Sequence, residues 1–242
     1  MNYENQEVFN SEASKTYLLA IGINDYNYEN WPILNMPVKD VRDVVSLLIE
    51  KYNITHVDTF FNDSASYLNI RNKIAYLKEI SKPQDAIIIY FAGHGEYDES
   101  FDKEGKWILS NGRLDNNSLA VAIEDIPARH ILVLADACFS GSFYLKRGKD
   151  KESSKVRNER KSRWVLASGS MESVLDQMPG KKNSPFAYHL IEFLKRAKVD
   201  VPFSELRDYL ETEVPKYTNQ KPVAGPVRGD EGGEFIFKKK KR

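Results

Sequence analysis

The stretch AIIIYFAGHG, residues 86–95, starts as an apolar, isoleucine-rich run and ends in a Gly-His-Gly turn. A short apolar run of this kind is typical of a strand that is buried on both faces of a sheet. The stretch ILVLADACFSG, residues 131–141, has the same form, with a cysteine where the first has a histidine. Each predicted strand therefore ends next to one chemically reactive side chain, His94 in the first and Cys138 in the second.

The rest of the chain alternates between predicted strands and predicted helices. The pattern predicts strands at 17–23, 57–61, 107–109, 164–167 and 235–237, and helices at 38–50, 67–80, 121–129, 184–195 and 203–214. Such alternation indicates an α/β fold, a three-layer αβα sandwich around a mainly parallel sheet. We expect one domain over residues 16–238, a disordered lead-in over 1–15 and a basic tail over 239–242.

In open parallel sheets, ligands bind beyond the C-terminal ends of the strands, which is where His94 and Cys138 are expected. A free thiol has a pKa of ~8.5, so only a small fraction is thiolate at neutral pH. A neighbouring imidazole can take the thiol proton and later protonate a leaving amine. The pair therefore predicts nucleophilic catalysis, although a lone cysteine is more often a small buried apolar residue.

Composition excludes several classes of protein. The 35 basic and 35 acidic side chains cancel, so no overall field favours nucleic acid or an anionic membrane. The single cysteine excludes an internal disulfide framework and fits a reducing compartment. The first fifteen residues lack the apolar core of a signal peptide, and no apolar run approaches the ~20 residues that span a bilayer. We expect a soluble, cytoplasmic protein with neither nucleic acid nor membrane as a partner.

Several motifs together resemble the caspase-like cysteine peptidases (peptidase C14), in particular metacaspases and bacterial caspase homologues. The motifs are LLAIGI at 18–23, AGHG at 92–95, DACFSG at 136–141, ASGS at 167–170, SPFAY at 184–188 and GEFIF at 233–237. The resemblance extends over residues 16–238 and implies the caspase-like form of the αβα sandwich. It also implies that His94 and Cys138 are catalytic and that the backbone amides of Gly95 and Cys138 form the oxyanion hole. No carboxylate is implied as a third catalytic group.

The resemblance further suggests a specificity pocket. Asp40 and Asp136 match the positions at which metacaspases bind a basic P1 side chain, and two carboxylates favour Arg or Lys on charge alone. Ala92 stands where the family has a serine, so one wall of the pocket is altered. The alternative for Asp40 is a charge that stabilises a helix N-terminus, and for Asp136 a turn residue.

A basic segment follows the cysteine. Residues 146–163 carry nine Lys or Arg side chains against three acids and few apolar residues, which predicts a mobile, solvated loop. Caspase-like chains carry the linker that is cut on maturation at this place, so the resemblance suggests a processing loop. Its basic residues are Lys146, Arg147, Lys149, Lys151, Lys155, Arg157, Arg160, Lys161 and Arg163.

Metal binding has weak support in the sequence. Several metacaspases need calcium, but the acids between the histidine and the cysteine form neither a dense cluster nor a complete EF-hand loop. We therefore predict no metal and no cofactor, and leave calcium dependence open. The acids in question are Asp98, Asp102, Asp115, Glu124 and Asp125.

The sequence thus favours a cysteine endopeptidase that cuts protein or peptide substrates after Arg or Lys and that processes itself. One alternative is a catalytically silent caspase-fold interaction module in a signalling or defence system. Another is a non-proteolytic hydrolase or transferase that uses the same thiol. The oligomeric state stays open, because nothing in the sequence distinguishes a monomer from a dimer.

Overall fold

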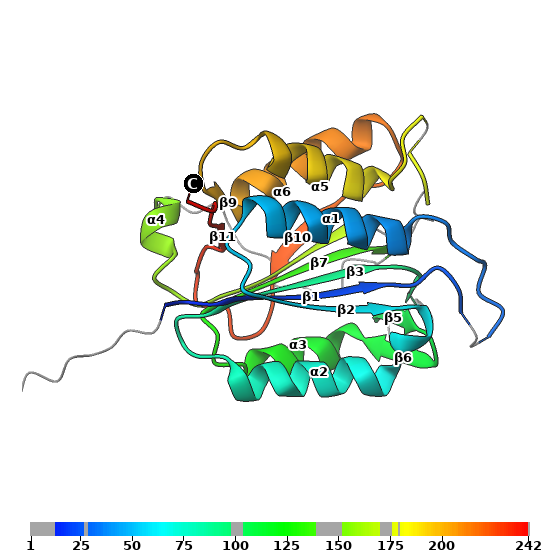
Figure 1. The fold of residues 1–242 in the computed structure, drawn as a ribbon, viewed down its shortest axis with the longest axis horizontal. Coiled ribbons are helices and arrows are strands. Elements are labelled where there is room, and N and C mark those ends of the chain that lie inside the picture. Colours follow the sequence, from blue (N-terminus) through cyan, green and yellow to red (C-terminus); the bar gives the residue numbers. More distant parts are fainter. Residues whose placement is uncertain are drawn as a thin grey trace, which may run out of the picture.

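A parallel sheet forms the centre of the molecule in the computed structural model, which describes residues 13–26, 29–97, 104–138, 152–169, 176–178 and 180–241, and only the backbone of Cys138. The strand order is β10-β8-β7-β3-β1-β2, and only β10 runs antiparallel to its neighbour (Figure 1). These strands are β1 (Thr16–Gly22), β2 (His56–Phe61), β3 (Ala86–Ala92), β7 (His130–Cys138), β8 (Ser162–Gly169) and β10 (Val223–Pro226).

Helices cover both faces of this sheet (Figure 1). In β3, Ile87, Ile89 and Phe91 pack into one buried core, whereas Tyr90 and Ala92 pack into the other, because successive side chains of a strand point to opposite faces. This arrangement confirms the expected three-layer αβα sandwich around a mainly parallel sheet. One face carries α1 (Pro37–Lys51), α5 (Pro185–Arg196) and α6 (Phe203–Glu213), and the other carries α2 (Tyr67–Ile80) and α3 (Asn116–Glu124).

Capping residues set where the helices begin. The hydroxyl of Ser66 accepts the N–H of Asn69 at the start of α2, and the hydroxyl of Ser184 caps α5 in the same way. The helix expected at 121–129 in fact begins at 116, because Asp115 caps it and ends the preceding strand.

A small antiparallel sheet separates the histidine from α3. It consists of β4 (Gly95–Tyr97), β5 (Gly105–Leu109) and β6 (Gly112–Asp115), of which the sequence predicted only the C-terminal part of β5, residues 107–109. Trp107 of β5 is buried and stacks on Phe91 of β3, with 4.5 Å between ring centroids. This aromatic contact fixes the small sheet against the C-terminal end of β3.

The predicted ends of the domain need adjustment. The last predicted strand exists as β11 (Ile236–Phe237), but it pairs with β9 (Val201–Pro202) and not with the central sheet. The tail is held at its first residue, since the N–H of Lys239 donates to Asp200 over 2.8 Å. At the other end, the N–H of Lys15 donates to Asp85 over 2.8 Å, so the lead-in is ordered from this point. Residues 1–12 lie outside the described residues.

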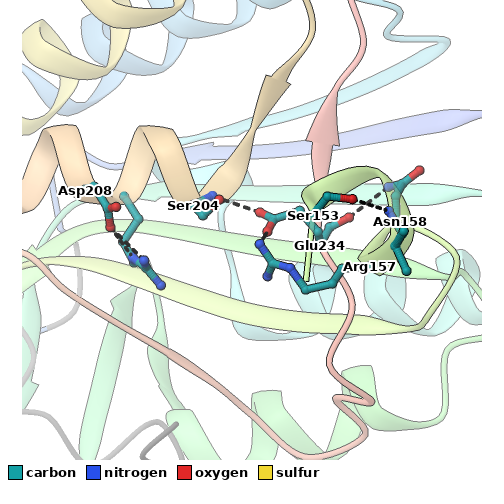
Figure 2. A network of polar contacts seen from close by, with 8 residues as sticks. Ser153, Arg157, Asn158, Ser204, Asp208 and Glu234 are labelled. Carbon is teal, nitrogen blue, oxygen red and sulfur yellow. Dashed lines mark hydrogen bonds and ion pairs between the residues drawn. The ribbon is translucent and has the colours of Figure 1, made fainter. Parts of the chain in front are cut away.

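The prediction of one mobile loop over 146–163 is wrong for its second half. Residues Ser154–Arg157 form α4, and β8 already starts at Ser162. Arg157 is only 8% exposed and is paired with the buried Glu234, which also accepts the N–H of Ser204 over 2.9 Å (Figure 2). The excess of basic side chains predicted that the segment is solvated, whereas the tertiary structure gives Arg157 a buried carboxylate partner.

Arg163 departs even further from the solvated loop that its charge predicted. It is fully buried, and its guanidinium donates to backbone carbonyl oxygens, including those of Ile126 and Ala128 at 2.8 and 2.7 Å. Burial lowers the pKa of Arg163 to about 10, and the nearby Asp230 and Glu231 oppose this change. Of the remaining basic residues of the predicted loop, Lys155 and Lys161 are exposed and Arg160 is half-buried, whereas Lys146, Arg147, Lys149 and Lys151 lie outside the described residues.

Candidate active site

The register of the central sheet brings the two reactive residues to the same edge. Strands β3 and β7 are parallel neighbours, and Ala92 of β3 lies opposite Asp136 of β7. The pairing extends one step further, because the N–H of Gly93 donates to the carbonyl of Asp136 over 3.3 Å. His94 and Cys138 each follow by two positions from this matched pair, so their backbones lie side by side at the C-terminal edge of the sheet.

A bulge immediately precedes Cys138. Ala135 pairs with Ala167 of β8, but Cys138 pairs with Gly169, so that Asp136 and Ala137 together oppose one residue of β8. Bulges of this kind are frequent next to active sites, where they change the direction of the strand. The break in register therefore lies between Ala135 and Cys138, and it includes the candidate pocket residue Asp136.

The imidazole of His94 is fixed by a backbone carbonyl. Its Nε2 atom lies 2.7 Å from the carbonyl oxygen of Pro32, and its ring centroid lies 5.1 Å from those of both Tyr26 and Trp31. A carbonyl oxygen can only accept, so Nε2 carries the hydrogen and Nδ1 is the basic nitrogen of the neutral ring. Burial lowers the pKa of His94, although the Pro32 carbonyl and Asp176 oppose this change. The lowered pKa favours the neutral imidazole, which is the form that can accept a proton.

Gly93 has no room for a side chain. A Cβ atom at this position would lie 2.6 Å from the hydroxyl oxygen of Tyr26. That hydroxyl accepts the backbone N–H of His94 over 2.7 Å, and burial raises the pKa of Tyr26, which keeps it neutral. The glycine before the histidine thus allows Tyr26 to hold the turn.

The backbone amide of Gly95 points away from the small sheet. The N–H of Ile108 donates to the carbonyl of His94 over 3.0 Å, and Gly95 is the residue opposite Trp107. Hydrogen-bonded and non-hydrogen-bonded pairs alternate along an antiparallel ladder, so the pair of Gly95 and Trp107 is of the second kind. The N–H of Gly95 is therefore directed to the outer side of β4, where a ligand could receive it.

The two predicted pocket acids come together beneath this edge. Asp40 of α1 is 1% exposed and Asp136 of β7 is 5% exposed. Ser184 joins them, since its N–H donates to Asp40 over 3.1 Å and its hydroxyl donates to Asp136. Asn183 donates to Asp40 over 2.8 Å and also to Asp43 over 2.7 Å. Residues from three separate elements thus converge on one pair of carboxyl groups.

Both carboxyl groups hold their protons more tightly than usual. Burial, followed by the charge of Asp136, raises the pKa of Asp40 to about 8, although the bonds from Asn183 and Ser184 oppose the rise. Burial also raises the pKa of Asp136 to about 6 against the bond from Ser184. Within the described residues, the Oδ1 atom of Asp136 and the hydroxyl of Tyr90 have no hydrogen-bond partner. A donor that reached this pair of carboxyl groups would meet unsatisfied acceptors.

Ala92, the altered pocket wall, also lies on this side of the sheet. It packs in the core shared with α1 and α5, as Tyr90 does, and it is directly opposite Asp136. The structure therefore groups Ala92, Asp40 and Asp136, the three residues that the sequence assigned to one pocket.

The sequence did not reveal several residues that hold the site. Pro32, Tyr26 and Trp31 come from the loop after β1, which carries no motif. Asp176 accepts the N–H groups of Asn35 and Met36 at 2.7 and 3.0 Å, which fixes the end of that loop to a segment that follows β8. Residues that are far apart in the sequence make these contacts, so the spacing of residues within a short segment gives no indication of them.

Metal binding gains no support. The residues that the structure describes contain no group of three or more His, Cys, Asp or Glu side chains that could hold a metal ion. Asp115 is engaged as the cap of α3. Glu124 and Asp125 lie at the far end of α3, and Asp98 and Asp102 lie outside the described residues. None of the described helices is long and apolar enough to cross a membrane.

Comparison with known proteins agrees with this arrangement. The family model of the caspase domain, peptidase C14, matches residues 15–228. The crystal structure of protein GSU0716 from Geobacter sulfurreducens superposes with a TM-score of 0.68 and 18% identity, over 88% of this chain and 94% of that chain. This likeness shows a shared fold. No curated protein sequence matches the chain. The matched residues include the central sheet, its helices, and the ends of β3 and β7 that carry His94 and Cys138. The chain therefore belongs to the caspase domain family.

Proposed function

We propose that the protein is a cysteine endopeptidase that cuts after Arg or Lys. The observation that carries the proposal is the buried pair of carboxyl groups, Asp40 and Asp136, directly beneath the sheet edge that bears His94 and Cys138. Membership of the caspase domain family supports protein or peptide substrates, because members are usually cysteine peptidases.

The reaction follows from the groups at the edge. Nδ1 of His94 takes the thiol proton of Cys138, and the sulfur attacks the scissile carbonyl. The backbone N–H groups of Gly95 and Cys138 stabilise the oxyanion that forms. The protonated imidazole then donates its proton to the leaving amine, and a water molecule releases the acyl group from the thioester. Pro32 plays the part of an orienting group, since its carbonyl holds Nε2–H while the opposite nitrogen acts.

The pocket supports a basic P1 residue. A guanidinium or ammonium group there would replace the protons that the paired carboxyl groups retain, and Asp136 offers an oxygen without a partner among the described residues. Arg fits such a site especially well, because its planar donors can contact both carboxylates at once.

Hydrolysis of fluorogenic peptides that differ only at P1 (Arg, Lys, Asp or Leu) tests the proposal. We expect turnover with Arg and Lys and essentially none with Asp or Leu. Cys138→Ala removes the activity, and His94→Ala lowers kcat by orders of magnitude while the circular dichroism spectrum stays that of the wild type. Preference for Asp at P1, or full turnover by Cys138→Ala, contradicts the assignment.

The high burial of Asp40 and Asp136 favours a second candidate, a catalytically silent interaction module. Both acids are already engaged by Ser184 and lie almost out of contact with solvent. A protein of this kind would cleave none of the four peptides, and its sole cysteine would react with iodoacetamide no faster than in His94→Ala. Rapid, His94-dependent alkylation at neutral pH separates a working pair from a silent one, whatever the substrate.

A further inference from the structure

We infer that Arg113 is a positioning residue for His94, because its guanidinium ties together the two chain segments that hold the imidazole. This inference rests on the proposed function for its kinetic consequences but not for its structural test. Arg113 lies in β6, two strands away from the histidine, and it belongs to none of the motifs that the sequence singled out.

The guanidinium spans two carboxylates. Its Nη1 and Nη2 atoms donate to the two carboxylate oxygens of Glu29, at 2.9 and 2.7 Å. Its Nε atom donates to Glu96 over 2.6 Å. Paired, parallel bonds to one carboxylate fix direction as well as distance, which a lysine ammonium cannot do. One side chain thus sets the position of Glu29 relative to Glu96.

Each of these glutamates is adjacent to a part of the histidine site. Glu96 follows Gly95 in β4, immediately after His94. Glu29 lies just before Trp31 and Pro32, which supply the ring contact and the carbonyl acceptor of His94. The bridge through Arg113 therefore connects β4, which directly follows the donor His94, with the loop that carries the acceptor carbonyl of Pro32 (the acceptor loop).

The acceptor loop needs such a constraint. Glu29 has a φ of 60°, in the left-handed region that non-glycine residues rarely adopt without support from their surroundings. The other end of the loop is fixed by Asp176, which accepts the N–H groups of Asn35 and Met36. Arg113 and Asp176 thus anchor opposite ends of the segment that carries Pro32, and loss of one anchor frees the carbonyl to move.

The expected effect of Arg113 on His94 is one of position, and not of a change in the charge of Arg113 or in the stability of the fold. Bonds to Glu29 and Glu96 raise the pKa of Arg113, so the guanidinium stays charged throughout the range in which the protein is folded. The side chain is 30% exposed and its partners Glu29 and Glu96 are 41% and 32% exposed, so solvent screens these contacts and limits their contribution to the stability of the fold. Its removal should therefore disturb the position of His94 more than the stability of the fold.

The decisive measurement is the Nε2–H proton of His94 in the ¹H–¹⁵N NMR spectrum of the full chain at pH 8, assigned by its loss in His94→Gln. In the wild type, its bond to Pro32 protects this proton from exchange with water. We expect Arg113→Ala to increase its exchange rate about tenfold or more. Arg129→Ala is the matched control, since that side chain is 34% exposed, pairs with Glu159 and lies away from the site. An unchanged exchange rate in Arg113→Ala overturns the inference, as does an equal increase in Arg129→Ala.

Kinetics provide the second test. We expect Arg113→Ala to lower kcat about 10- to 100-fold with KM within about threefold, and Arg113→Lys to recover little of the loss. Glu29→Ala should reproduce the defect, and the double variant should be no worse than either single one, because both changes break one bridge. Additive losses in the double variant contradict the bridge. If the wild type cuts no peptide, the proposed function fails, and the NMR comparison still decides the role of Arg113.

Discussion

Asp40 and Asp136 form the buried acidic pair of the proposed P1 pocket, where burial and then the charge of Asp136 raise the pKa of Asp40 to about 8. The pair is held by Ser184, which gives its N–H to one acid and its hydroxyl to the other. Two carboxyl groups this close titrate as a unit, so the apparent pKa values belong to the pair. The charge of the pocket therefore changes over the neutral pH range.

This titration predicts a pH-dependent P1 preference. The pair loses its two protons as pH rises through about 6 and about 8, whereas a P1 arginine keeps its charge throughout. Attraction in the pocket thus increases with pH. We expect the ratio of kcat/KM for an Arg substrate to that for a Gln substrate to rise about tenfold or more between pH 6 and pH 8.5. The ratio cancels the titration of the catalytic pair, which both substrates share.

Asp40→Asn should flatten that profile and lower the ratio at pH 8.5, because one of the two carboxylates is gone. Asp125→Asn, at a 68% exposed side chain, serves as the control and should leave the profile unchanged. If the ratio of kcat/KM for the Arg and Gln substrates stays constant with pH in the wild type, these two acids do not bind the charged P1 side chain.

The same pocket predicts a cost in stability at high pH. A carboxyl group whose folded pKa lies above its unfolded value of 3.8 keeps a proton that the unfolded chain has lost. The folded state therefore binds more protons, and the free energy of unfolding falls as pH rises from about 4 to about 8. We expect Asp40→Asn to raise Tm by about 2–4 °C at pH 8.5 and by little at pH 5, as measured by calorimetry. A larger gain at pH 5 than at pH 8.5 contradicts the burial of Asp40 as an acid.

Self-processing should be restricted to the first part of the basic segment. Arg157 and Arg163 are buried within α4 and β8, so they cannot enter another active site as an extended peptide. We expect incubation of the wild type to produce new termini after Lys146, Arg147, Lys149 or Lys151, and Cys138→Ala to remain intact. Mass spectrometry of the fragments identifies the termini, and a cut after Arg157 or Arg163 in folded protein runs against the expectation.

Glu234 should be a stability determinant far from the site. It pairs with the buried Arg157 and accepts the N–H of Ser204, so it joins α4 to the start of α6 (Figure 2). Glu234→Ala removes a buried carboxylate from the buried guanidinium of Arg157, which should lower the free energy of unfolding by about 3–5 kcal/mol. Urea unfolding followed by fluorescence measures the loss. Glu231→Ala, which removes a 59% exposed partner of Lys161, should cost less than about 1 kcal/mol. Equal losses in the two variants would show that burial of the pair is unimportant.

The apolar runs of the sequence were sufficient to predict β3, β7 and the αβα sandwich, because buried parallel strands have no polar face. Their ends also identified His94 and Cys138, since a turn of small residues after such a run exposes the next side chains. The pairing of Asp40 with Asp136 was expected only through the family resemblance, and the sheet register and Ser184 at the start of α5 bring the two acids together.

Only the tertiary structure decided what holds the histidine and what happens to the basic segment. Pro32, Arg113 and Asp176 act on the site through contacts between distant parts of the chain, and spacing along a sequence carries no trace of such contacts. Arg157 and Arg163 belong to a segment with the composition of a solvated loop, yet in the interior Arg157 pairs with a carboxylate and Arg163 donates to a set of carbonyl oxygens. Local pattern determines which segments become strands and helices, whereas the fate of a charged side chain depends on the partners that folding places around it.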